Sequence, residues 1–199
     1  MHLISLFAIF PLVVSIPLFS QAVPSAYSGG GPAIVVGAGV SNYYTEMFPK
    51  HMEGVAVWAD CNSHRGPFYL RGFGVEAEVR DLDSRQPTGN NLRLATLGGG
   101  PIWTWRRYRK FHPYGKFLID YGSMAHIKSP GFPSWYTADK WVTGATGGGV
   151  EYRAWRNVWV RADYEYQFWR VDWFNTTSFL DPRGFTVGVS YDLKHIHAH

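Results

Sequence analysis

The feature that most constrains this chain is a two-residue alternation of apolar and polar side chains, which recurs in separate segments. The clearest segment is 184–193, where the odd positions are apolar: Phe185, Val187, Val189, Tyr191 and Leu193. Glycine, hydroxyl and carboxyl side chains occupy the even positions. Successive side chains of a β-strand point to opposite faces, so this alternation predicts strands with one apolar and one polar face.

The alternation and the turn residues between segments predict eight strands, at 35–44, 53–61, 71–81, 92–105, 114–124, 142–154, 157–169 and 184–193. Most are about ten residues long, which suits a tilted strand that crosses a bilayer. The alternation is weaker at 53–61, 92–105 and 114–124, where Leu92 and Leu118 fall on the polar face. The predicted fold class is all-β, an eight-stranded antiparallel up-and-down transmembrane barrel.

The chain begins with an apolar stretch at residues 3–20, which Pro11 and Pro17 interrupt. Such a stretch is typical of a signal peptide rather than of a spanning helix. Small residues at Ser20 and Ala22 place the cleavage site after residue 22. We therefore predict a signal peptide at 1–22, a barrel at 23–193 and a tail at 194–199. A single cysteine, Cys61, excludes a disulfide-stapled scaffold.

Two kinds of barrel fit this pattern. A soluble lipocalin-like barrel has its apolar face inside, whereas a membrane barrel turns that face to lipid. Aromatic and charged residues each make up 17% of the chain, against about 25% charged residues in an average soluble domain. The polar face also combines glycines with both signs of charge, which suits a closed lumen packed with ion pairs. These observations favour the membrane barrel.

Ten charged side chains lie on the polar faces of the predicted strands and are predicted to line the lumen: Glu76, Glu78, Arg80, Lys116, Asp120, Glu151, Arg153, Arg161, Asp163 and Glu165. Aromatic residues near strand ends are predicted to form a girdle at each lipid–water interface. One girdle comprises Tyr44, Tyr121, Tyr166 and Phe168, and the other comprises Tyr69, Tyr152 and Tyr191.

The predicted connections alternate in length. Residues 82–91, 125–141 and 170–183 form long loops at one end, whereas 62–67 and 154–157 form short turns at the other. Outer-membrane barrels have short periplasmic turns and long extracellular loops. The long loops are therefore predicted to bind any extracellular ligand.

The last strand carries a family resemblance. Gly188, Tyr191 and Leu193 follow the spacing of an assembly signal, with an aromatic residue three positions after a glycine and an apolar residue two further on. With the strand count, this resembles the small eight-stranded outer-membrane β-barrel family, which includes the OmpA-like transmembrane domain and the outer membrane protein beta-barrel domain group. The six residues from Lys194 to His199 depart from the family pattern, in which the signal ends the barrel.

The resemblance implies a place in the bacterial outer membrane, with outer-membrane lipids and the barrel-assembly machinery as partners. A wide pore is disfavoured because eight strands leave a filled lumen. The predicted function is a structural or adhesive role, or narrow solute passage. The alternatives are a lipid-modifying enzyme similar to the lipid deacylases and a soluble exported ligand-binding barrel.

Other clusters are given simpler interpretations. His195, His197 and His199 alternate in the tail, which is predicted to be solvated rather than to bind a metal. Arg106, Arg107, Arg109 and Lys110 lie beside Trp103 and Trp105, and in an exported barrel they indicate contact with lipid headgroups rather than nucleic acid. His126 and Ser129 are three residues apart and point to opposite faces of a strand, so no catalytic site and no cofactor is predicted.

Overall fold

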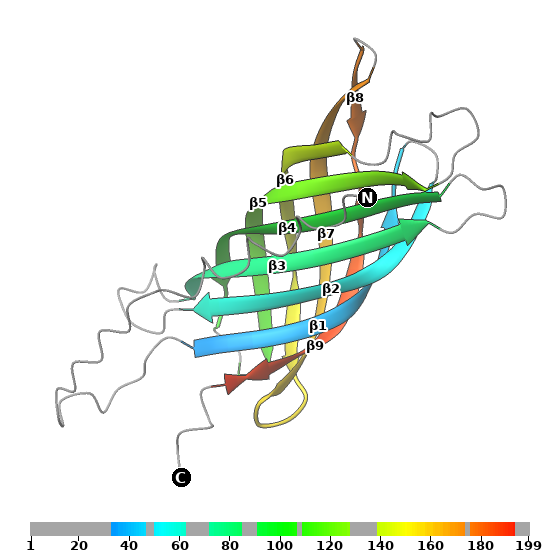
Figure 1. The fold of residues 1–199 in the computed structure, drawn as a ribbon. Coiled ribbons are helices and arrows are strands. Elements are labelled where there is room, and N and C mark those ends of the chain that lie inside the picture. The colour runs from blue at the N-terminus through cyan, green and yellow to red at the C-terminus, as the bar shows by residue number, and fades with distance from the viewer. Residues whose placement is uncertain are drawn as a thin grey trace, which may run out of the picture. The chain divides into compact units, whose positions relative to one another are not determined.

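The computed structural model describes residues 33–46, 50–62, 72–84, 91–106, 109–127, 139–173 and 176–193. These residues contain nine strands (Figure 1): β1 (Ala33–Tyr44), β2 (His51–Asn62), β3 (Phe73–Ser84), β4 (Asn91–Thr104), β5 (Phe111–Ile127), β6 (Asp139–Arg153), β7 (Val158–Trp173), β8 (Thr176–Leu180) and β9 (Arg183–Asp192). Among the described residues, no helix is long and apolar enough to span a membrane.

The strands close into a barrel because every strand from β1 to β7, together with β9, pairs on both sides. The sheet runs β6-β5-β4-β3-β2-β1-β9-β7, and an additional β6–β7 pairing joins its two ends. All of these pairings are antiparallel. The predicted fold class, an eight-stranded antiparallel barrel, is confirmed.

Strands β8 and β9 pair with β7 in one continuous register. Leu180 of β8 lies opposite Trp169, and Arg183 of β9 lies opposite Tyr166. The ladder is interrupted at Pro182, which has no N–H to donate, although its carbonyl accepts a 2.8 Å hydrogen bond from the Gln167 amide. Both strands therefore lie along β7, with β9 in the closed barrel and β8 in the hairpin beyond it.

The strands at the loop end run farther than predicted. Residues 170–173 and 176–180 are paired strand rather than loop, and β7 and β8 extend as a hairpin at the end of the barrel opposite the β6–β7 turn (Figure 1). Strands β3 and β5 continue to Ser84 and Ile127. The loop predictions used polarity, but a strand that has left the lipid can be polar on both faces. At the other end, the connection after Asn62 reaches Phe73 and is longer than the predicted turn.

The barrel has polar side chains inside and apolar side chains outside. Along β3 the residues alternate strictly, with Glu76, Glu78 and Arg80 buried and Val75 and Val79 about half exposed. An outer face of exposed valines, isoleucines and aromatic residues surrounds these buried charges. This arrangement excludes the lipocalin-like alternative, which needs the apolar face inside.

Glycines give two large inward side chains their space. The indole of Trp58 lies across β1 and β9, where a Cβ placed on Gly37 or Gly188 would approach the ring to 2.5 and 2.6 Å. Trp169 covers Gly122 in the same way, at 2.5 Å. Real Cβ atoms do not make such contacts, so any larger residue would displace a tryptophan from the lumen.

Candidate functional site in the barrel lumen

Lys116 on β5 forms the centre of a buried ion network. Its Nζ lies 3.0 Å from Glu76, 2.5 Å from Glu78, 2.9 Å from Glu165 and 3.4 Å from Asp163. The carboxylates come from β3 and β7, on either side of β5, so this one ammonium group connects strands across the lumen. An ammonium group removed from water needs several acceptors, and Lys116 has four.

Arg161 on β7 is the second cation of the network. Its guanidinium lies 2.7 Å from Glu76, 3.3 Å from Asp60 and 3.3 Å from Asp163, and its Nε donates a 2.6 Å hydrogen bond to the Tyr114 hydroxyl. Tyr114 in turn donates to Asp163 at 2.9 Å. The guanidinium also stacks over the Trp58 and Tyr114 rings, with 4.7 and 4.4 Å to their centroids.

Arg80 on β3 is the third cation and connects the network to the loop end. It pairs with Glu165 and with Glu78, the latter at 2.5 Å, and donates to the Tyr43 hydroxyl. From Glu165 the hydrogen bonds continue toward the loop end through two side chains of β7. Gln167 donates to Glu165 at 2.9 Å, and Trp169 donates to Gln167 at 2.9 Å.

An apolar plug fills the lumen next to this network. Eight buried side chains form it, from every strand except β6 and β9: Tyr43, Met52, Leu82, Leu92, Leu94, Met124, Trp169 and Leu180. Trp141 of β6 packs against them and is partly buried. Seven of them lie in the halves of their strands nearest the loop end, and Leu180 lies at the end of β8 that adjoins the barrel. The lumen is therefore filled in two layers, one of paired charges and one of apolar side chains.

Nine of the ten predicted lumen charges are buried. Asp120 and Glu151 are among them, but within the described part of the chain neither forms an ion pair with Lys116, Arg161 or Arg80. The Asp120 carboxylate lies over Gly98. Among the described residues, Glu151 Oε1 has no hydrogen-bond partner. The tenth, Arg153, departs from the prediction. It is exposed at the end of β6, and its guanidinium donates to the Arg156 carbonyl at 2.7 and 3.1 Å. At a strand end, a long side chain reaches the turn and the solvent more readily than the lumen.

The predicted girdle residues that the structure describes all lie on the outer face of the barrel. Tyr121, Tyr152, Phe168 and Tyr191 are exposed, and Tyr44 and Tyr166 are half-buried. Register places Tyr44 and Tyr166 at one end, since both lie opposite Arg183, and Tyr191 at the other, opposite Val36 and Val158. Tyr69, Ser129, the predicted signal peptide and the tail with His195, His197 and His199 lie outside the described residues, as does the side chain of His126.

Several lumen residues were missed by the sequence interpretation. Asp60, Tyr43, Tyr114 and Gln167 all contact the network, and Trp169 joins it to the plug. Asp60 was missed because 53–61 alternates weakly, and the tyrosines because aromatic residues were assigned to lipid. The parity of each strand was the available signal. Among the described residues, no cluster of three or more His, Cys, Asp or Glu side chains is arranged to hold a metal ion.

Comparison with known proteins agrees with this geometry. A family model described as "Outer membrane protein beta-barrel domain" matches residues 12–192. Neisserial surface protein A is similar in structure, with a TM-score of 0.62 and 14% identity, over 81% of this chain and 99% of that one. OprG of Pseudomonas aeruginosa has a TM-score of 0.57 and 10% identity, over 81% of this chain and 96% of that one. Ail of Yersinia pestis has a TM-score of 0.51 and 11% identity, over 82% of this chain and 99% of that one. No curated protein sequence matches this chain.

Proposed function

This chain belongs to the outer membrane protein beta-barrel domain family, and we propose that it serves as a sealed scaffold whose loop end makes adhesive or structural contacts. It is an integral β-barrel protein of the bacterial outer membrane. The observation that carries the proposal is the filling of the lumen by a charged network and an apolar plug in series. A solute would have to displace both layers.

The loop end supports recognition outside the barrel. The β7–β8 hairpin extends the barrel wall there, and among the described residues β8 pairs with β7 alone. One similar structure, Ail, is named an attachment invasion locus protein, and it has been solved with the heparin analogue sucrose octasulfate. These names belong to Ail, and they support an adhesive role for this chain through the shared fold and a protruding loop end.

Two measurements test the proposal together. The purified barrel in a planar bilayer is expected to give no stable single-channel conductance, because the plug and the network block the lumen. Cells that display a variant in which residues 171–178 are replaced by a two-residue turn are expected to lose adhesion to surfaces that the parent binds. Steady conductance by the parent would instead favour the narrow-solute function. Full adhesion by the shortened variant would show that the hairpin is not needed for adhesion.

We further infer that this barrel is not catalytic. The buried carboxylates on one face of β3, Glu76 and Glu78, are both engaged by Lys116, so neither is available as an acid–base pair. Purified protein incubated with outer-membrane lipid is expected to release no fatty acid. Release of fatty acid that is lost on His126→Ala would establish the alternative, a lipid-modifying enzyme.

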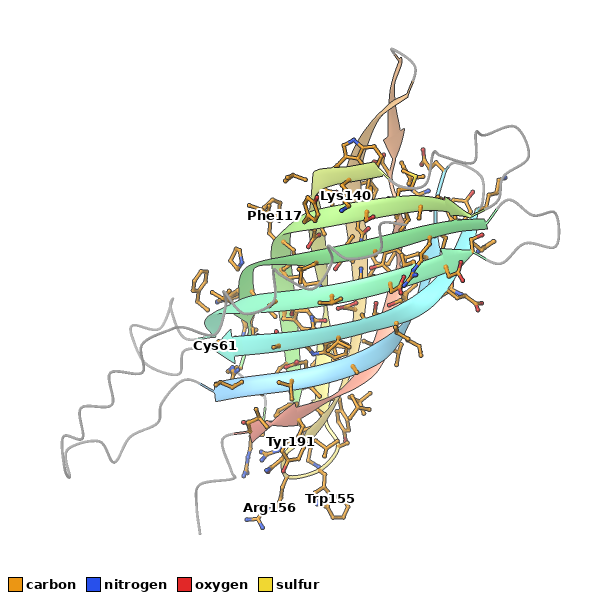
Figure 2. All side chains as sticks on the ribbon, viewed as in Figure 1. Cys61, Phe117, Lys140, Trp155, Arg156 and Tyr191 are labelled. Carbon is orange, nitrogen blue, oxygen red and sulfur yellow. The ribbon has the colours of Figure 1, made fainter. Side chains whose placement is uncertain are left out.

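We also propose that the end of β9 carries the assembly signal. Gly188, Tyr191 and Leu193 would be recognised by the barrel-assembly machinery, and Tyr191 is exposed at the end of β9 where such contact is accessible (Figure 2). Tyr191→Ala is expected to slow membrane assembly in cells more than the outward-facing Phe185→Ala. Equal assembly of the two variants would contradict a role for the signal.

A further inference from the structure

A basic pocket lies at the end of the barrel opposite the β7–β8 hairpin. It has a volume of about 480 Å³ and is lined by Arg109, Lys110, Tyr152, Arg153, Ala154, Trp155 and Arg156. Four of these residues are cationic, and the described lining contains no carboxylate. Trp155 and Arg156 project together at this end in Figure 2. The lining therefore has the charge of a site for an anion.

Backbone hydrogen bonds hold the pocket in shape. The Arg153 amide donates to the Lys110 carbonyl at 2.8 Å, which brings the start of β5 against the β6–β7 turn. The Arg153 guanidinium is used within the turn, where it binds the Arg156 carbonyl. Arg109, Lys110 and Arg156 also line the pocket, and all three side chains are exposed. Three cations on a fixed backbone lose less entropy on binding than cations on a mobile loop.

The aromatic residues of the pocket place it at a membrane interface. Trp155 is 74% exposed and Tyr152 is 48% exposed. Tryptophan and tyrosine side chains are enriched at the depth of the lipid headgroups, where one end of the ring is apolar and the other is wet. An anion bound between them is therefore one held at the bilayer surface, such as a lipid phosphate.

A second hollow lies on the lipid-facing side of β3 to β6. It has a volume of about 390 Å³, and its outward-facing lining includes Phe73, Trp103, Gly115, Phe117 and Thr146. Figure 2 shows Phe117 on this side of β5. A Cβ on Gly115 would meet no heavy atom closer than 3.9 Å. Packing within the barrel thus leaves space for a side chain at Gly115, and the glycine keeps the groove open.

The pocket and the groove share the outer face of β5 and β6. Tyr152 lies opposite Phe111 at the pocket, Gly148 opposite Gly115, and Thr146 opposite Phe117 at the groove. At about 3.3 Å per residue, Thr146 lies roughly 20 Å along the strand from Tyr152. A strand tilted by about 45° covers about 14 Å of depth in that length, close to the roughly 15 Å of one leaflet's hydrocarbon. The two hollows are therefore spaced like the headgroup and the acyl chain of one lipid.

We propose that this face is a binding site for an anionic glycerophospholipid. Its phosphate lies among Arg109, Lys110 and Arg156, and one acyl chain runs past Val150 into the groove at Gly115. The site lies at the short-turn end, which in an outer-membrane barrel faces the periplasm. The occupant is therefore a phospholipid of the inner leaflet rather than a lipopolysaccharide.

Native mass spectrometry of the detergent-purified barrel tests the headgroup site. The parent is expected to bind phosphatidylglycerol more tightly than phosphatidylcholine. Arg109→Gln/Arg156→Gln is expected to weaken phosphatidylglycerol binding by roughly 30-fold, since each surface cation contributes modestly. The matched control Lys50→Gln/Lys140→Gln removes the same charge from exposed positions at the other end and is expected to bind as the parent does. All four positions are exposed, and heat-modifiable gel mobility verifies folding. Equal binding by the two double variants, or a preference for lipopolysaccharide, would overturn the proposal.

A groove-filling substitution tests the acyl-chain part separately. Gly115→Leu is expected to lower the affinity for both phospholipids several-fold while the preference for phosphatidylglycerol remains, because the phosphate contacts are unchanged. Ala38→Leu is the control, since Ala38 is also exposed on the outer face but lies on β1, away from the groove. Unchanged binding by Gly115→Leu would show that no acyl chain occupies the groove and would overturn this part.

Discussion

The charged network and the apolar plug fill the same lumen in different ways. The network around Lys116, Arg80 and Arg161 depends on the positions of individual atoms, because each buried charge needs a partner within hydrogen-bonding distance. The aliphatic side chains of the plug, such as Leu82 and Met124, depend mainly on volume, since their contacts have no direction. We therefore expect the network to tolerate few substitutions and these aliphatic positions to tolerate any that conserve volume.

The largest effect is expected from Arg161→Met, which retains much of the side-chain volume but removes the charge. Asp60, Glu76 and Asp163 would then lose a shared cation in a buried site. Removal of one partner from a buried ion pair costs about 3–5 kcal/mol of unfolding free energy. Urea unfolding in lipid vesicles, followed by tryptophan fluorescence, measures the loss.

The neighbouring outward residue provides the control for this substitution. Val160 faces lipid and is 39% exposed, so Val160→Ala is expected to cost about 1 kcal/mol or less. Equal losses of unfolding free energy for Arg161→Met and Val160→Ala would mean that the network stabilises the barrel no more than the outer face does. The expected difference between the network and the plug would then be wrong.

The plug is expected to respond to volume rather than to chemical identity. Leu82 is 1% exposed within the plug. Leu82→Ala leaves a cavity and is expected to cost about 2–4 kcal/mol, whereas Leu82→Met conserves volume and is expected to cost less than about 1.5 kcal/mol. The same unfolding measurement distinguishes them. A loss for Leu82→Met as large as that for Leu82→Ala would show that the plug, like the network, depends on specific contacts.

Parity predicted the side on which a residue lies better than it predicted the role of that residue. The alternation of β3, β7 and β9 assigned Glu76, Arg161 and Val187 to the correct faces, and with them the eight-stranded fold. Leu92 and Leu118 look like errors of alternation only if the whole lumen is assumed to be polar. Both are buried, and Leu92 belongs to the plug. At Leu92 the weak alternation therefore reflects the apolar plug, whereas Leu118 is a buried apolar residue between Lys116 and Asp120 on the inner face of β5.

Pairing partners could not be read from the sequence. Arg161 reaches Asp60, which is 101 positions away, because the stagger and curvature of the closed sheet bring β2 and β7 together across the lumen.

Strand ends were equally hard to predict, since the polar residues Asp81 and Arg93 were placed near a loop boundary. They form an exposed ion pair at 2.5 Å within the β3–β4 ladder. Local polarity does not report long-range register.

The smallest effect is expected from Asp60→Asn, because the network contains more carboxylates than cations. Asp60, Glu76, Glu78, Asp163 and Glu165 surround only Lys116, Arg80 and Arg161. Asp60 meets one cation of the network, Arg161, at 3.3 Å, and its Oδ1 has no hydrogen-bond partner among the described residues. Asparagine keeps an acceptor oxygen and removes surplus negative charge, so the loss of unfolding free energy is expected to stay below about 1 kcal/mol.

Glu76→Gln is the matched comparison for Asp60→Asn, since both substitutions neutralise one buried carboxylate. Both oxygens of Glu76 are engaged, one by Lys116 at 3.0 Å and the other by Arg161 at 2.7 Å. Its loss is expected to reach about 2–3 kcal/mol, because hydrogen bonds to charged groups are stronger and an amide can accept only one of the two. If the two variants lose equal stability in the unfolding assay, total charge governs the network. If Glu76→Gln loses more, as expected, the network is stabilised by individual contacts, and the contrast with the volume-dependent plug holds down to single oxygen atoms.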